Sequence, residues 1–141
     1  MADEKIDPSV ETTIDAPLDE VWKCWLTPED IVQWNNASDE WYTPKADNDL
    51  TVGGKFVYKM EARDGSFGFD FSGTYEKIEE KKLLEYVLTD GRKVSVAFEE
   101  SAGTTTVTET FEPEAENTVE TQKAGWQSIL NNFKKYVENK E

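Results

Sequence analysis

The clearest periodic pattern in the sequence lies near its C-terminal end, between Asn117 and Asn139. Apolar residues recur there at i, i+3, i+4, i+7 and i+11, which places them on one face of an α-helix. Asn117 followed by Glu120 resembles a capping box and predicts that the helix starts at Asn117. Gly125 lies inside this helix at a cost of about 1 kcal/mol relative to alanine, so we expect the space beside it to serve a closely packed strand or a ligand. The residues of the apolar face are Trp126, Ile129, Leu130, Phe133 and Val137.

Upstream of this helix, from Lys55 to Phe111, apolar and polar residues alternate with a period of two, which is typical of β-strands that bury one face. Asp64-Gly65 and Asp90-Gly91 interrupt the alternation and predict tight hairpin turns. The apolar positions change phase after Tyr75, which predicts a β-bulge near Glu76. The pattern therefore predicts an antiparallel meander.

The sequence pattern of the N-terminal third predicts a strand and two short helices. Residues 10–15 alternate, and Ala16-Pro17 ends that strand. An amphipathic stripe over residues 18–25 predicts the first helix, and Thr27-Pro28 starts the second. The segment from Asn35 to Leu50 is rich in Asn, Ser, Asp and Pro, so we expect a loop with a short strand inside it. A loop of this length is often functional, and we expect it to act as a lid.

The order of elements is one strand, two short helices, about six antiparallel strands and one long helix, which is the α+β class. A long amphipathic helix that follows a run of strands buries its apolar face on the sheet that they form. At 141 residues the chain is expected to be a single domain over residues 1–141. A strongly curved sheet wrapped around the last helix would leave a cavity between them.

Composition and charge exclude several classes of partner. The net charge of −15 argues against nucleic acids and against anionic membrane surfaces. The chain starts without a basic region or an apolar run, and its single cysteine, Cys24, allows no internal disulfide, so we expect a cytoplasmic protein. Histidine is absent, which removes the commonest metal ligand and the commonest general base at neutral pH. We therefore expect no metal and no cofactor.

Aromatic residues are the strongest evidence for function. They supply more bulk than a small layer of sheet and helix usually needs, and an apolar cavity with a few polar groups is the usual form of a small-molecule site. A completely filled core is the alternative interpretation. The residues that we expect to bind the ligand are Trp34, Asn36, Trp41, Tyr58, Met60, Phe69, Phe71, Tyr86, Glu109, Gln122, Gly125, Trp126 and Ile129.

One acidic residue is a weak candidate for catalysis. Glu109 alternates with Val107 and Phe111 along a predicted strand. If it shares their inward face, burial raises its pKa and makes it a general acid/base or a ligand anchor, with Gln122 positioning a substrate. In the other register Glu109 lies outside with Thr105. The sequence leaves both orientations open.

A set of short motifs, in order along nearly the whole chain, resembles the helix-grip superfamily (birch-pollen-allergen-like, START-related, SRPBCC). Within it the chain is similar to the branch named for activators of the heat-shock-protein-90 ATPase. The resemblance implies a curved antiparallel sheet, in β-α-α-β6-α order, wrapped around a long C-terminal helix. The motifs are Ile14-Asp15-Ala16-Pro17 with Val21-Trp22, Thr27-Pro28-Glu29, Trp34-Asn35-Asn36-Ala37-Ser38 with Trp41, Asp49-Leu50 with Gly53-Gly54-Lys55-Phe56, Phe71-Ser72-Gly73-Thr74-Tyr75, and Gln122-Lys123-Ala124-Gly125-Trp126 with Leu130, Phe133 and Tyr136.

The resemblance leaves three functions open, because this superfamily hosts lipid carriers, cyclases, hydrolases and cochaperone domains. The first, which we predict, is binding of a small apolar or aromatic molecule. The second is a cofactor-free enzyme of the cyclase or hydrolase kind that uses a buried acid. The third, which the family name alone implies, is regulation of the heat-shock-protein-90 ATPase or a role in stress response, with the chaperone as a protein partner.

Overall fold

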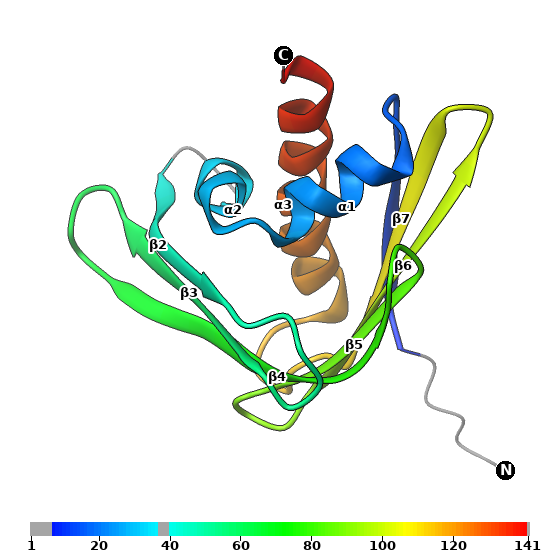
Figure 1. Cartoon of the computed structure of the whole chain (residues 1–141). Coiled ribbons are helices and arrows are strands. Elements are labelled where there is room, and N and C mark those ends of the chain that lie inside the picture. The colour runs from blue at the N-terminus through cyan, green and yellow to red at the C-terminus, as the bar shows by residue number, and fades with distance from the viewer. Residues whose placement is uncertain (1–6, 37–39, 141) are drawn as a thin grey trace, which may run out of the picture.

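A computed structural model describes residues 7–36 and 40–140 of the chain. In this part seven strands form one antiparallel sheet in the order β1-β7-β6-β5-β4-β3-β2, and the sheet curves around the long helix α3 (Figure 1). The predicted α+β helix-grip fold is confirmed. The strands are β1 (Ser9–Ile14), β2 (Trp41–Asn48), β3 (Lys55–Ala62), β4 (Gly68–Glu79), β5 (Leu83–Leu88), β6 (Lys93–Ser101) and β7 (Thr104–Phe111), and the helices are α1 (Leu18–Leu26), α2 (Pro28–Trp34) and α3 (Val119–Asn139).

Helix α3 begins two residues later than the sequence pattern predicts. Its N-cap is Thr118, whose hydroxyl accepts a hydrogen bond from the backbone N–H of Thr121 at 3.1 Å. Asn117 instead donates from its backbone and its side chain to the carboxylate of Glu114. The predicted start at Asn117 is therefore wrong, because the next residue supplies the capping oxygen.

The C-terminal half of α3 is fixed to the first strand of the sheet. Phe133 on its inner face is completely buried. On the flank, Lys134 Nζ donates to the backbone carbonyl of Thr13 at 2.5 Å, and the Glu138 carboxylate accepts the backbone N–H of Asp15 at 2.8 Å. These contacts hold one half of the helix against β1 and so determine where its other half lies over the sheet.

Strand β4 contains the bulge that the change of phase predicts. Its register against β5 shifts between Tyr75 and Lys77, so Glu76 is the extra residue. Beyond the shift, Ile78 pairs with Leu84 and again packs against the core. A bulge bends the strand and increases its twist, which favours the curvature that the sheet needs to surround α3.

Strand β2 occupies half of the segment from Asn35 to Leu50, which is expected from the sequence to be a loop with a short strand inside it. It pairs with β3 along its length, with one irregularity between Tyr42 and Lys45, where Pro44 lies. Proline is tolerated at edge strands and bulges because it lacks the N–H that a regular ladder needs. The lid predicted for Asn35 to Leu50 is therefore wrong over residues 41–48, which are held in the sheet. Positions 37–39 of that segment lie outside the described residues.

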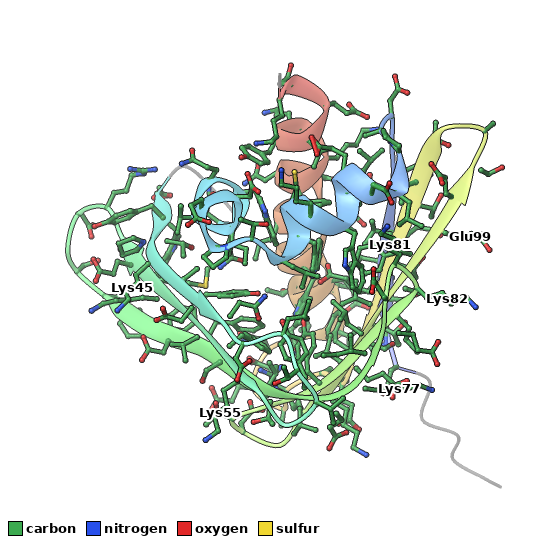
Figure 2. The ribbon with its side chains drawn as sticks, in the orientation of Figure 1. Lys45, Lys55, Lys77, Lys81, Lys82 and Glu99 are labelled. Atoms are coloured by element: carbon green, nitrogen blue, oxygen red, sulfur yellow. The ribbon has the colours of Figure 1, made fainter. Side chains whose placement is uncertain are left out.

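The outer face of the sheet is polar. Lys45, Lys55 and Lys77 are exposed, and their side chains point away from helix α3 (Figure 2). Alternation along each strand places the apolar residues on the opposite, concave face. The concave face and α3 together therefore enclose the apolar interior in which the candidate site lies.

Candidate functional site

A cavity of about 450 Å³ lies between the N-terminal half of α3 and the concave face of the sheet. This volume falls within the range of small-molecule sites. The strands β3, β4 and β5 supply most of its wall, and α3 supplies the opposite wall. The strand residues are Phe56, Tyr58, Met60, Phe69, Phe71, Tyr75, Leu84 and Tyr86, and the helix residues are Thr121, Gln122, Gly125, Trp126 and Ile129.

With one exception, every residue predicted for the ligand site lines this cavity, and that these residues bind a ligand stays a prediction. The exception is Asn36. Helix α2 ends at Trp34, and the next side chain, that of Asn35, is buried and donates to the Thr43 hydroxyl at 3.2 Å. Asn35 therefore lines the cavity in place of Asn36, whose backbone carbonyl accepts a hydrogen bond from Asn132 outside it.

Some lining residues were not identified from the sequence. Phe56 and Tyr75 lie on the same alternating faces as predicted neighbours, so the period of two could have identified them. Arg92, Glu114 and Asn117 come from the β5–β6 turn and from the linker between β7 and α3. Loop residues carry no periodic signal, so only the folded chain reveals their position.

Glu109 has the inward orientation. Its side chain is only 5% exposed and lines the cavity, and its neighbours Thr105, Val107 and Phe111 on β7 are completely buried. Within the described chain no group forms a hydrogen bond with its carboxyl. Burial raises the pKa of Glu109 from 4.5 to about 8, because removal from water disfavours the charged form. At neutral pH Glu109 is therefore mostly a neutral acid.

Three buried tyrosines provide further polar atoms in the cavity wall. The Tyr75 hydroxyl donates to Asn48 Oδ1 at 2.6 Å, and burial raises the pKa of Tyr75 to about 12. Burial also raises the pKa of Tyr58 and of Tyr86 well above 10, and the nearby Glu109 carboxyl adds to both shifts. All three phenols remain neutral at physiological pH, so the site combines apolar rings with uncharged hydroxyls.

The helix wall is open at Gly125. A Cβ atom built at this position would meet nothing within 4 Å, so the close strand packing considered for this glycine is wrong. The neighbouring Trp126 ring stacks on the Phe111 ring, with centroids 4.5 Å apart and planes inclined by 6°. It also lies edge-to-face with the Phe71 ring, with centroids 6.1 Å apart. The glycine therefore leaves free volume beside an ordered aromatic wall.

Gln122 lines the cavity while it holds the linker that precedes α3. Its amide nitrogen donates to the carbonyls of Glu114 at 3.1 Å and Asn117 at 2.8 Å. Its amide oxygen accepts the backbone N–H of Glu114 at 2.8 Å. Both amide protons are thus committed to the linker, and Gln122 shapes the cavity wall more than it offers a free donor to a substrate.

Metal binding and a reactive thiol each have requirements that the described residues do not meet. No group of three or more His, Cys, Asp or Glu side chains within residues 7–36 and 40–140 is arranged to hold a metal ion. Burial raises the pKa of the Cys24 thiol to about 11, so the thiol stays protonated. Its backbone carbonyl accepts a hydrogen bond from Trp34 Nε1 at 3.0 Å, which fixes that indole in the cavity wall.

Solved structures show the same fold. An AHSA1-like protein from Aeromonas hydrophila is 44% identical, with a TM-score of 0.85, over 93% of this chain and 92% of that chain. A protein from Cytophaga hutchinsonii is 47% identical, with a TM-score of 0.82, over 94% of this chain and 92% of that chain. A protein from Nitrosomonas europaea shares the fold at 18% identity, with a TM-score of 0.78 over 97% of each chain. No curated protein gives a significant match.

A family model agrees with these structures. The model described as "Activator of Hsp90 ATPase homolog 1-like protein" matches residues 15–138, which is most of the chain. None of the helices in the described parts is both long enough and apolar enough to cross a bilayer. The chain belongs to the activator of Hsp90 ATPase homolog 1-like family, within the helix-grip superfamily.

Proposed function

We propose that this protein reversibly binds a small, mostly apolar or aromatic molecule in the cavity between α3 and the sheet. The observation that carries the proposal is the cavity itself, about 450 Å³ lined largely by aromatic rings and by one buried acid. The helix-grip fold of this family is that of ligand-binding domains, which supports the same conclusion. Burial of apolar ligand surface against these rings would supply most of the binding free energy.

The aromatic wall continues from the interior to the protein surface. Phe69 lines the cavity and is 43% exposed, and its ring lies 5.8 Å from that of Trp41, which also lines the cavity. Deeper inside, the ring centroids of Tyr58 and Phe71 lie 6.2 Å apart. An apolar molecule could therefore stay in contact with aromatic surface as it moves from the rim at β2–β4 to the interior.

Filling the space at Gly125 should block the site. In the Gly125→Leu variant the added side chain occupies free cavity volume, so bound ligand and side chain would compete for the same space. Fatty acids, aromatic acids and flavonoids would be titrated while indole fluorescence and melting temperature are followed. A compound at a hundred times its Kd should stabilise the wild type by about 2.7 kcal/mol and should stabilise Gly125→Leu far less.

A matched control separates this effect from a general change in the helix. Lys135 is exposed on the same helix, so Lys135→Leu adds the same side chain away from the cavity and should leave binding intact. Gly125→Ala should stabilise the ligand-free protein by about 0.5–1 kcal/mol in urea unfolding, because its Cβ meets no neighbour. Equal binding by wild type and Gly125→Leu would place the ligand elsewhere.

The buried Glu109 favours a second candidate function, a cofactor-free enzyme that moves a proton. A general acid or base works best when its pKa lies near the operating pH, and the pKa of about 8 meets that condition. A carboxyl-carbon NMR titration of Glu109 should show a midpoint well above 4.5. A midpoint near the ordinary value would leave no reason to assign proton transfer to Glu109. Regulation of a chaperone rests on the family's name alone, so we do not propose it.

A further inference from the structure

We propose that the cavity selects molecules that carry one basic nitrogen on an apolar or aromatic skeleton, and that the ammonium group binds against Glu109. This inference rests on the proposed ligand-binding function and specifies the class of ligand. It joins three features of the cavity: a carboxyl to which no described residue donates a hydrogen bond, neutral aromatic rings around it, and no free cation among the described lining residues.

The first feature is the unused hydrogen-bonding capacity of Glu109. The side chain is 95% buried and faces the cavity, yet no group of the described chain donates to it. A polar group that is removed from bulk water without a partner is destabilising, and hydrogen bonds to charged groups are the stronger ones. A ligand ammonium supplies both a donor and the opposite charge. A ligand carboxylate would instead place two acids in one apolar space.

The second feature is the set of rings that surrounds the same space. Tyr58, Tyr75 and Tyr86 reach it from three neighbouring strands, β3, β4 and β5, and Trp126 reaches it from α3. The phenols stay neutral because burial raises the pKa of each. Aromatic faces attract desolvated ammonium groups through cation–π interactions, which is how aromatic cages recognise alkylated amines. Neutral rings beside one carboxyl therefore favour a cationic group.

The third feature is the arrangement of the other charged groups that face the cavity. Arg92, on the β5–β6 turn, is held by Asp90, with Nε and Oδ2 2.7 Å apart. Glu114, on the linker before α3, accepts hydrogen bonds from Asn117. Helix α3 contributes no titratable side chain to the described lining. Among residues 7–36 and 40–140 no cation neutralises Glu109, and the net charge of −15 attracts cations toward the protein.

Binding of an ammonium group to this site has a defined proton balance. The unliganded Glu109 is mostly protonated at pH 7, since burial raises its pKa to about 8. When an alkylammonium ion binds, the carboxyl loses its proton to solvent and the carboxylate pairs with the ammonium. One positive charge enters and one proton leaves. Amine binding should therefore tighten as pH rises from about 6 to about 8, whereas binding of a neutral alcohol should not.

Matched probes test the ligand class. Calorimetry would follow the titration of nine compounds into the full-length protein. They are the amine, the alcohol and the carboxylic acid of three skeletons: naphthylethyl, phenylbutyl and decyl. The amine should bind at least about tenfold more tightly than the alcohol of the same skeleton at pH 8, and the acid should bind most weakly. Titration at pH 7 in phosphate and in Tris, whose ionisation enthalpies differ, should reveal the released proton.

Glu109→Gln distinguishes the outcomes. This variant keeps the size and polarity of the side chain but cannot carry a negative charge, so it should lose the amine preference about tenfold or more and keep alcohol binding. If alcohols or acids bind as tightly as amines, or if Glu109→Gln retains the amine preference, the amine inference fails while ligand binding stands. If no probe binds and Gly125→Leu behaves as wild type throughout, the proposed function fails with it.

Discussion

Glu109→Gln should stabilise the ligand-free protein strongly at alkaline pH and hardly at all in acid. The Glu109 carboxyl is buried, and its pKa is raised from 4.5 to about 8. Below about pH 4.5 the folded and unfolded chains both carry the proton, and burial has no electrostatic cost. Between the two pKa values only the unfolded chain ionises, so the free energy of unfolding falls by about 1.4 kcal/mol per pH unit. The total loss by about pH 8 is on the order of 5 kcal/mol.

Urea unfolding of both proteins between about pH 4 and pH 9 measures this effect. The difference in unfolding free energy should be small near pH 4, should grow with pH in favour of Glu109→Gln, and should level off above about pH 8. Glu99→Gln is the control, because Glu99 is exposed on the outer face of the sheet, on strand β6, where it is labelled in Figure 2. A difference that is flat over the whole range would show that Glu109 is not buried as an unpaired acid.

Such a cost in stability is consistent with a role in function. A glutamine or a leucine at position 109 would suit an apolar interior better, so folding alone does not account for the acid. Residues whose environment shifts the pKa strongly, and which lie in a cavity, are frequent at binding and catalytic sites. A ligand that pairs with the carboxylate would recover part of the lost free energy, which links the stability of this protein to its occupancy.

The fold was predictable because local patterns agree with one another along the chain. The period of two, the Asp-Gly turns and the change of phase at Glu76 each identify a feature that the sheet contains. The apolar stripe of α3 likewise predicts the face that packs inside. Strand β2 is the exception, since its Pro44 and its polar residues resemble a loop, and only a short strand is expected from the sequence within that segment. Pairing with β3 stabilises it as an edge strand, and such pairing has no local signature.

The orientation of Glu109 could not be decided from its strand alone. Strand β7 reads Thr-Thr-Thr-Val-Thr-Glu-Thr-Phe, so one face carries only threonine, and the other face combines two apolar residues with Thr105 and Glu109 and is not uniformly apolar. Pairing with two neighbours resolves the ambiguity, because Glu109 lies opposite Val10 on β1 and Val96 on β6. Both partners are buried. The face of a central strand is thus set by its neighbours, which a single stretch of sequence does not contain.

Gly125 shows a similar limit of local reasoning. A glycine inside a helix indicates that a side chain is excluded or not needed at that position. The sequence does not tell whether a closely packed strand or an empty space lies beside it. Only the neighbours of the position decide, and here no atom lies within 4 Å of the place that a Cβ would take. Tyr58, Phe69, Phe71 and Tyr86 were identified because the alternation along their strands places them on the inner face, whatever fills the space between them.

Phe133→Ala should cost about 3–5 kcal/mol of unfolding free energy, as expected for removal of a fully buried aromatic side chain. Its ring is completely buried and meets Trp25 and Trp34 edge-on, with centroids 4.8 Å apart in each pair. The variant would leave a void where α3 packs on α1 and α2. Urea unfolding at a fixed pH is the measurement, and melting temperature should fall in parallel.

Trp126→Ala, two turns earlier on the same helix, is the informative comparison. Trp126 is only half-buried and lines the cavity, so its removal should cost less, about 1–2 kcal/mol. It should nevertheless weaken ligand binding, because the ring stacked on Phe111 forms one wall of the site. Phe133→Ala should have the opposite balance: a large loss of stability, with binding kept wherever the variant remains folded. Equal losses of unfolding free energy in the two variants would show that both halves of α3 contribute equally to the stability of the fold. Unequal losses would support a helix whose C-terminal half stabilises the fold and whose N-terminal half forms the binding site.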